Sequence, residues 1–435
     1  MIDLTELGGE GGKRLTRAFV LHPELKNKPG PREPEDALAE AMALAHALPG
    51  LDVRGGQVVR LPRAHPGQLF GKGKLEELRQ ALEADEIELV LIDGPVSPVQ
   101  QRNLEKAWNV KLLDRTGLIL EIFADRAATR EGVLQVELAA LSYQRTRLVR
   151  AWTHLERQRG GLGFVGGPGE TQIEADRRAI DEQMTRLRRQ LDKVAKTREL
   201  HRAARRKVPY PVVALVGYTN AGKSTLFNRL TGANVMAKDM LFATLDPTMR
   251  AVRLPTGKNV ILSDTVGFIS DLPTLLVAAF RATLEEVLEA DLILHVRDIA
   301  HPSTEVQATD VAEVLASLGV DDDTPRIDLW NKADQLDDAT RLQVDRQAER
   351  AEGVFVGSAL TGAGLDALFG AITAQLDDAR HHDTVTLTHA DGRLRAWLYE
   401  QGVVEAETQG DAESVLHVHW SDRQQARFRA LRHRD

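Results

Sequence analysis

Residues 217–224 combine residue types and a spacing that can bind the phosphates of a nucleotide. They read Gly-Tyr-Thr-Asn-Ala-Gly-Lys-Ser and directly follow the apolar run 211–216, which predicts a buried strand. In a G-x-x-x-x-G-K-S loop, the glycines let backbone N–H groups approach the phosphate oxygens. Lys223 can then reach the β- and γ-phosphates, and the Ser224 hydroxyl can coordinate Mg²⁺. The pattern predicts a phosphate-binding loop.

Three shorter motifs follow in order, each after a strand-like apolar run. In 264–267, Asp-Thr-Val-Gly, the carboxylate can hold Mg²⁺ through water and the glycine N–H can contact a γ-phosphate. In 331–334, Asn-Lys-Ala-Asp, the Asp334 carboxylate can accept from the N1–H and N2–H₂ groups of guanine, a donor pair that adenine lacks. Ser358-Ala359 offers a backbone N–H to guanine O6. The ordered set predicts a guanine-nucleotide-binding domain.

Residues 241–248 form a loop with two threonines, between the first two motifs. A threonine hydroxyl here could complete the Mg²⁺ shell only while a γ-phosphate is present, which would make the loop a switch. Thr244 is the preferred residue, Thr248 is the reserve, and an ordinary Asp-Pro turn is the alternative. Phe268 stands where many such switches place a glutamine that orients the attacking water, so slow hydrolysis without a partner is expected. The predicted nucleotide-binding residues are Gly217, Tyr218, Thr219, Asn220, Ala221, Gly222, Lys223, Ser224, Thr225, Phe242, Ala243, Thr244, Leu245, Asp246, Asp264, Thr265, Val266, Gly267, Asn331, Lys332, Ala333, Asp334, Ser358, Ala359 and Leu360.

Composition and charge limit the other possibilities. The 435 residues suggest two or three domains, and the absence of cysteine excludes disulfides and thiolate metal sites. No signal-peptide pattern or membrane-length apolar run is present, which favours a cytoplasmic protein. The net charge is −8, but 145–207 holds seventeen Lys and Arg against eight Asp and Glu, a local +9 that leaves −17 elsewhere. This asymmetry predicts a basic element facing an anionic surface, with a solvated pair of charged helices as the alternative.

The predicted fold is α/β, in four consecutive parts. Residues 1–127 alternate strand-like and helical patterns, and form a small α/β domain. Residues 128–208 form a helical hairpin, and 209–378 form a doubly wound, mostly parallel P-loop domain. Residues 384–435 form a small α+β appendage, after a linker at 379–383 whose histidines are expected to be solvated.

The hairpin prediction rests on two apolar series with heptad spacing. Leu134, Leu138, Leu141, Leu148, Trp152 and Leu155 form the first, and Ile173, Ile180, Met184, Leu187, Leu191 and Val194 form the second, with Arg145 and Arg177 at polar seam positions. Between the series, the tip 160–169 contains six glycines and one proline. A flexible tip on a basic stalk can enter a crevice in folded RNA, with Phe164 stacking on a base, while an unstructured connector is the alternative. The predicted RNA contacts are Arg157, Arg159, Phe164, Arg177 and Arg178.

The chain resembles the HflX family, in the Obg-like branch of translation-associated GTPases, over about 65–376. The motifs that carry the resemblance are 70–78 (Phe-Gly-Lys-Gly-Lys-Leu-Glu-Glu-Leu), 97–104 (Ser-Pro-Val-Gln-Gln-Arg-Asn-Leu), 114–120 (Asp-Arg-Thr-Gly-Leu-Ile-Leu), 135–139 (Gln-Val-Glu-Leu-Ala), 166–170 (Gly-Gly-Pro-Gly-Glu), 174–178 (Glu-Ala-Asp-Arg-Arg), 242–248 (Phe-Ala-Thr-Leu-Asp-Pro-Thr) and 280–286 (Phe-Arg-Ala-Thr-Leu-Glu-Glu). Two positions depart from the family pattern: Gly166 replaces a common arginine, and 297–300 reads Arg-Asp-Ile-Ala where Val-Asp-Ala-Ser is usual.

The resemblance implies a protein that binds the large ribosomal subunit and its rRNA in the GTP state and dissociates stalled ribosomes under stress. It implies that the tip 160–169 reaches toward the peptidyl-transferase centre, that Ser224 and Thr244 bind Mg²⁺, and that Asn220 helps hold K⁺ against the phosphates. Lys223, Asn220 and Thr244 are therefore the expected catalytic residues, in a monomer with no membrane span. Two alternatives remain: a GTP-gated adaptor that docks on RNA without splitting ribosomes, and an NTPase of relaxed specificity with ATP bound by the N-terminal domain.

Overall fold

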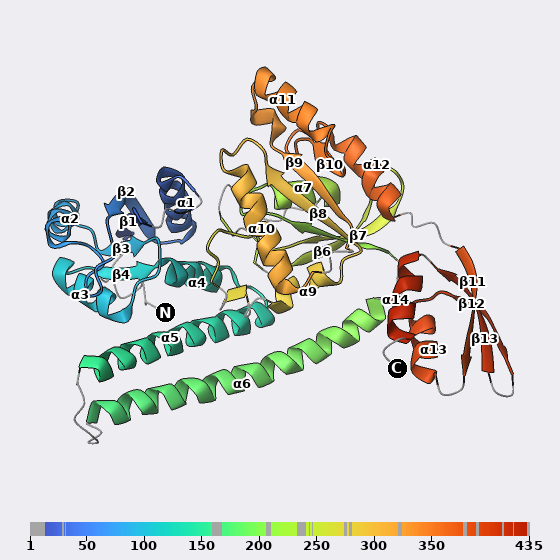
Figure 1. The fold of residues 1–435 in the computed structure, drawn as a ribbon, viewed down its shortest axis with the longest axis horizontal. Helices are drawn as coiled ribbons and strands as arrows, with labels where there is room; N and C mark the ends of the chain where they lie inside the picture. The colour runs from blue at the N-terminus through green and yellow to red at the C-terminus, as the bar shows by residue number, and fades with distance from the viewer. Residues whose placement is uncertain are drawn as a thin grey trace.

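Among the residues that the structure describes, three β-sheets follow one another along the chain, and in sequence a long pair of helices separates the first sheet from the second. In Figure 1 this pair of helices runs below both sheets. The computed structural model describes residues 14–27, 30, 32–158, 168–205, 210–232, 241–242, 244–245, 247–273, 276–277, 281–320, 324–376, 381–388, 391–410, 413–420 and 422–432. This arrangement confirms the predicted α/β class. Among these residues, no helix combines the length and apolar character that crossing a bilayer requires.

The first sheet is parallel throughout, with strand order β2-β1-β3-β4. Its elements are β1 (Thr16–Leu25), α1 (Pro34–Ala47), β2 (Leu51–Leu61), α2 (Lys72–Ala84), β3 (Leu89–Ile92), α3 (Pro98–Trp108), β4 (Lys111–Asp114) and α4 (Arg115–Arg126). All four residues of β3 are buried, as expected for a parallel strand that helices cover on both faces. A capping box of Ser97 and Gln100, with Pro98 at the first helical position, begins α3.

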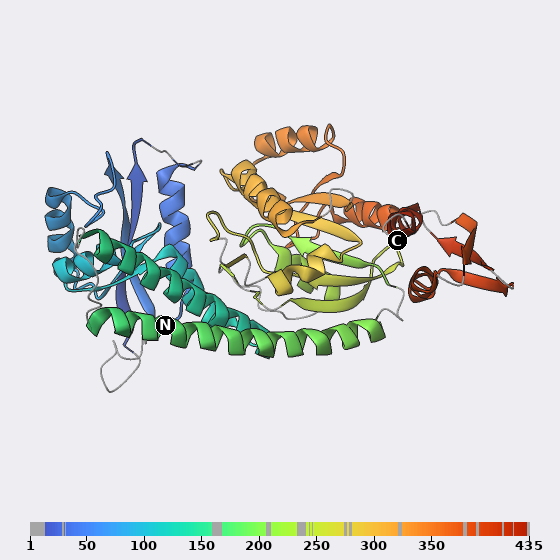
Figure 2. The same cartoon turned by 60° about the horizontal axis from the view of Figure 1, so that its bottom comes forward.

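Two long helices, α5 (Arg130–Gln158) and α6 (Pro168–Arg205), form the predicted antiparallel hairpin (Figures 1 and 2). On the seam, Met184 and Leu187 are buried, and Arg145 pairs with Asp181 across the hairpin at 2.7 Å. Val136 and Ala139 lie outside the predicted heptad series but are buried, because this end of α5 also packs on α4. The tip residues 159–167 lie outside the described residues. The helix α6 ends at Arg205, and β5 of the second sheet begins at Val212.

The second sheet has the order β10-β9-β8-β5-β7-β6 and is parallel except for β6, which runs antiparallel to β7. Its elements are β5 (Val212–Val216), α7 (Lys223–Thr231), β6 (Thr248–Arg253), β7 (Asn259–Asp264), α9 (Arg281–Leu288), β8 (Leu292–Asp298), α10 (Thr304–Leu318), β9 (Arg326–Asn331), the 3-10 helix η1 (Ala333–Gln335), α11 (Asp338–Ala348), β10 (Val354–Val356) and α12 (Leu365–Leu376). This is the predicted doubly wound layout. The carboxyl ends of β5, β7, β9 and β10 therefore meet at one edge, where such sheets bind ligands.

The third sheet, with order β11-β13-β12, is antiparallel. Its elements are β11 (His381–Thr388), α13 (Gly392–Glu400), β12 (Val404–Gln409), β13 (Glu413–Trp420) and α14 (Asp422–Arg432). The predicted linker at 379–383 is wrong for its last three residues, because β11 begins at His381. The His382 ring stacks on that of His419 on the paired strand at 4.5 Å, and so makes a cross-strand contact.

The first two sheets share one apolar core. Leu118, Ile119 and Phe123 of α4 belong to the same buried cluster as Phe242 and Leu276 of the P-loop domain. Phe123 meets Phe242 edge to face, with ring centroids 4.7 Å apart. The helical layer beneath the first sheet therefore packs directly against the loops that follow the phosphate-binding motif.

Candidate nucleotide site

The phosphate-binding loop leaves β5 with a backbone that requires glycine at two positions. Gly217 has φ +150°, and a Cβ there would lie 2.2 Å from the Val296 carbonyl oxygen. Gly222 has φ +98°, and a Cβ there would lie 2.1 Å from the Asn331 amide nitrogen. Both glycines thus bring the loop into contact with neighbouring strands. The helix α7 begins at Lys223, so its N-terminal N–H groups face the end of the loop.

Lys223 is buried inside the loop that it serves. Its ammonium group donates to the carbonyl oxygens of Gly217 at 3.1 Å and Tyr218 at 2.9 Å. Burial lowers the pKa of Lys223 to about 8, and the charge of Asp264 opposes that shift. An anion bound at the loop would favour the charged ammonium, since opposite charges stabilise one another more strongly in a buried site.

Three oxygen-bearing side chains from separate segments converge next to Lys223. Asp264 Oδ2 accepts from the hydroxyls of Ser224 at 2.7 Å and Thr244 at 2.9 Å, and those two hydroxyl oxygens lie 3.0 Å apart. Burial raises the pKa of Asp264, while Lys223 and the two hydroxyl donors act in the opposite direction. Asp264 Oδ1 is buried and accepts no hydrogen bond from the described residues. Two hydroxyls and one carboxylate, whose Oδ1 has spare acceptor capacity, fit Mg²⁺, which prefers oxygen ligands.

The base-recognition motifs are joined to the phosphate-binding loop through Asn331. Its Nδ2 donates to the Ala221 carbonyl at 2.7 Å, and its Oδ1 accepts from the Ala359 N–H at 2.7 Å. Lys332 adopts φ +63° and pairs with Asp298 at 2.8 Å. Asp334 lies exposed in η1, so its carboxylate is available to a ligand. One buried amide therefore joins the loop 217–224, the motif 331–334 and the segment at Ser358-Ala359.

The segment after Asp264 is hydrogen-bonded to the phosphate-binding loop. Thr219 N–H donates to the Phe268 carbonyl at 2.7 Å, and Phe268 N–H donates to the Gly217 carbonyl at 3.1 Å. The Phe268 side chain is buried in the shared core. Gly267 is so close to Thr219 that a Cβ would lie 2.9 Å from its Cα.

Other predicted site residues occupy different environments. Phe242, Leu245, Thr265 and Val266 are buried, and Thr265 donates to the Leu215 carbonyl at 2.6 Å. Asn220 is exposed with φ +60°, and Leu360 is also exposed. Ala243, Asp246, Arg159 and Phe164 lie outside the described residues, as does the side chain of Arg157. Arg177 and Arg178 lie exposed on α6, and Arg178 pairs with Glu174.

Sequence reasoning missed a group of polar residues next to this site. The Tyr218 side chain turns away from the phosphate-binding loop and donates to Glu40 of α1. Arg115 of α4 donates to the Ser270 carbonyl at 2.8 Å. These partners are separated by 178 and 155 positions. No spacing rule could have paired them.

Comparisons with known proteins cover nearly the whole chain. Four family profiles match in order: "GTP-binding GTPase N-terminal" at 35–124, "GTP-binding GTPase Middle Region" at 126–205, "50S ribosome-binding GTPase" at 212–332 and "HflX C-terminal domain" at 343–431. The GTPase HflX of Magnetococcus marinus is 51% identical over 369 residues, which are 85% of this chain and 84% of that protein. The chain belongs to the HflX family of GTPases. The GTPase HflX of Escherichia coli is 46% identical over 351 residues, 81% of this chain and 82% of its own length.

HflX membership makes the chain a GTP hydrolase whose GTPase domain is of the ribosome-binding class. Among solved structures, SsGBP in complex with GDP matches with a TM-score of 0.48 and 23% identity, over 82% of this chain and 98% of that one.

The departure from the family pattern at 297–300 is accommodated by local contacts. The Arg297 guanidinium lies 5.3 Å from the centroid of the Trp330 ring and pairs with Glu305 at 2.6 Å.

Proposed function

We propose that this GTPase binds the large ribosomal subunit in its GTP state and separates stalled ribosomes into subunits. The observation that carries the proposal is the long hairpin α5–α6, whose second helix ends seven residues before the first strand of the GTPase sheet and whose two helices are linked in sequence by the glycine-rich segment (Figure 2). A helix of 38 residues such as α6 is about 57 Å long. Such an arm can carry its tip far from the nucleotide pocket, and the segment 145–207 has the positive charge that rRNA attracts.

Within the pocket, each segment has a distinct proposed task. Lys223 pairs with the terminal phosphates, and Asp334 accepts from guanine. Ser224 and Thr244 hold Mg²⁺, with Asp264 beside them. When bound, the ion neutralises charge that develops on the transferred phosphoryl group. Because Thr244 belongs to the loop 241–248, loss of the γ-phosphate releases that loop, and the protein leaves its ribosome-binding state.

Hydrolysis is proposed to be slow until a ribosomal partner orients the attacking water. The support is the burial of Phe268, which leaves that position without a side chain able to do so. Stimulation by K⁺ through Asn220 stays a prediction. The proposed protein acts as a monomer, and it would meet its ribosomal partner in the cytoplasm.

Sedimentation of ribosomes with the protein tests the proposal. With a non-hydrolysable GTP analogue, whole ribosomes should convert to separate subunits, and with GDP they should stay whole. Deleting 162–167 should preserve GTP binding and abolish separation. Co-migration with intact ribosomes under the GTP analogue would instead indicate the adaptor, and equal activity with ATP would indicate the NTPase of relaxed specificity.

A matched pair of charge reversals separates arm contacts from general charge effects. Arg177→Glu with Arg178→Glu changes exposed residues of α6, whereas Arg346→Glu with Arg350→Glu makes the same change on exposed positions of the GTPase domain. The first pair should weaken subunit binding at least tenfold. The second should leave it within twofold of the parent, and equal effects of the two pairs would contradict a role for the arm.

A further inference from the structure

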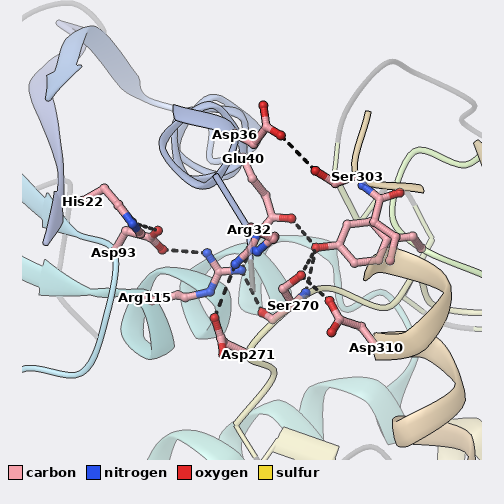
Figure 3. A network of polar contacts seen from close by, with 12 residues as sticks. His22, Arg32, Asp36, Glu40, Asp93, Arg115, Ser270, Asp271, Ser303 and Asp310 are labelled. Carbon is pink, nitrogen blue, oxygen red and sulfur yellow. Dashed lines mark hydrogen bonds and ion pairs between the residues drawn. The ribbon is translucent and has the colours of Figure 1, made fainter. Parts of the chain in front are cut away.

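The segment that follows the 264–267 motif is held at both backbone groups of a single residue (Figure 3). The Ser270 N–H donates to the Tyr218 hydroxyl oxygen at 2.8 Å, and the Ser270 carbonyl accepts from Arg115 Nη2 at 2.8 Å. The Ser270 hydroxyl donates to Asp310 of α10. One of these partners belongs to the phosphate-binding loop and one to the N-terminal domain. Ser270 therefore connects the nucleotide site with another domain.

Glu40 closes this arrangement from α1. It accepts from the Tyr218 hydroxyl, from Arg115 Nη2 at 2.6 Å and from Arg32 Nη1 at 2.9 Å. Burial raises the pKa of Tyr218, and the Glu40 charge raises it further, so the phenol keeps its proton and donates. We call Glu40, Arg115, Tyr218 and Ser270 the interdomain cluster.

The contacts of Arg115 in the interdomain cluster require the fork geometry of a guanidinium group. Its Nη1 donates to Asp93 at 2.6 Å while its Nη2 donates to both Glu40 and Ser270. Only 6% of its side chain is exposed, so these contacts are shielded from water. A lysine would keep the charge but could not direct donors to three acceptors in this fork.

Asp114, the residue before Arg115, connects the start of α4 to the hairpin. Asp114 caps α4 by accepting from Gly117 N–H at 2.8 Å. It also accepts from the Tyr143 hydroxyl at 2.6 Å and from Arg147 Nη1 at 3.2 Å, and both of those residues lie on α5. The first residue of α4 therefore contacts the GTPase domain, and the residue before it contacts the hairpin.

The same helix also contacts the loop that carries Thr244. Two turns after Arg115, the Phe123 ring packs on Phe242, two positions before that threonine. The two segments that the proposed function makes responsive to a γ-phosphate thus both contact α4, one through polar groups and one through apolar groups.

We propose that α4 couples the nucleotide state of the GTPase site to the hairpin, with the interdomain cluster as its contact and Glu40 and Arg115 as positioning residues supplied by the N-terminal domain. Rearrangement of 264–271 on nucleotide exchange changes the hydrogen bond between Arg115 and the Ser270 carbonyl. The helix α4 then transmits that change to α5 through Asp114. Because coupling is reciprocal, weakening the interdomain cluster must alter the relative affinity for the two nucleotide states.

The test compares two arginines of the same helix. Arg115→Lys removes the fork at the cluster. Arg126→Lys makes the same substitution at the other end of α4, where the guanidinium donates to the Ala47 carbonyl within the N-terminal domain at 3.0 Å. Affinities for GDP and for a non-hydrolysable GTP analogue are measured for each full-length variant with fluorescently labelled nucleotides. Arg115→Lys should change the ratio of the two dissociation constants at least threefold, and Arg126→Lys should leave the ratio at the parental value.

The hairpin itself provides a second readout, because a chain without cysteine accepts two unique labels. Leu342→Cys on α11 and Glu182→Cys on α6 are exposed positions for spin labels. The distance between the labels should differ between the two nucleotides in the parent, and Arg115→Lys should remove at least half of that difference. Arg126→Lys should retain it.

Three results would overturn the proposal. The first is a parent in which the distance between the labels is the same with both nucleotides. The others are a folded Arg115→Lys variant that keeps the parental distance difference, or one that keeps the parental ratio of dissociation constants. If Arg115→Lys does not fold, as judged by thermal melting, Glu40→Gln takes its place under the same criteria. No ribosome is present in these measurements, so their failure would leave the proposed ribosome-splitting function untouched.

Discussion

The buried amide of Asn331 provides the sharpest stability prediction for the nucleotide site. Its two hydrogen bonds, each 2.7 Å long, join the phosphate-binding loop at Ala221 to the base-recognition loop at Ala359. Both of those residues are buried. In Asn331→Ala, the Ala221 carbonyl and the Ala359 N–H lose their partner, and each unsatisfied buried group costs about 1–3 kcal/mol. The local cost is therefore about 2–6 kcal/mol before any rearrangement.

The assay measures local opening, since a chain of several domains does not unfold in one two-state step. In hydrogen exchange of the nucleotide-free protein, peptides that contain Ala359 should exchange at least thirtyfold faster in Asn331→Ala, because about 2 kcal/mol of lost protection corresponds to that factor. GDP affinity should fall at least tenfold. Asn259→Ala, at an exposed position of β7, is the control and should change neither quantity. Unchanged exchange at Ala359 in the Asn331 variant would refute the reasoning.

Four further predictions concern the nucleotide site and the apolar core beside it. Asp334→Asn should weaken GTP binding tenfold or more in titrations, because losing the carboxylate acceptor should cost at least about 1.4 kcal/mol of binding free energy, which is a factor of ten in the dissociation constant. Unchanged affinity would rule out the role of Asp334 toward guanine. Gly267→Ala should slow single-turnover hydrolysis, because its Cβ would lie 2.9 Å from Thr219 Cα; a parental rate would show that the segment has room to move. Phe123→Ala should lower the free energy of local opening around the Phe123–Phe242 contact by about 3–5 kcal/mol, and Phe123→Leu by less, in hydrogen exchange of peptides that contain Phe123; equal losses would argue against the ring contact. Replacing K⁺ with Na⁺ should slow hydrolysis if Asn220 helps hold the ion, and an identical rate would remove that prediction.

The sequence predicted those parts of the fold whose information is local in the chain. Each nucleotide motif directly follows a buried strand, so its place at the carboxyl edge of a parallel sheet could be predicted from the order of the segments. The hairpin could be predicted from its heptads for the same reason. Strand β12 and helix α14 are harder to predict, because both are largely polar and their positions depend on contacts with the rest of the third sheet.

Contacts between distant segments could not be predicted. Tyr218 was expected at the nucleotide only because it lies in the phosphate-binding loop, and its hydroxyl instead reaches Glu40 of another domain. Arg115 lies within an ordinary helix start, and nothing near it in the sequence indicates a buried cation with three acceptors. Such pairings depend on how two domains pack against each other, and no local pattern in a single sequence indicates that packing.

The short separation in sequence between α6 and β5 has a mechanical consequence. The strand that ends in the phosphate-binding loop is attached, through 206–211, to the longest helix among the described residues. A load applied along that helix by a large particle would pull on the centre of the sheet and on the phosphate-binding loop. Tension on the arm would therefore alter how long a nucleotide stays bound, even with every pocket residue unchanged.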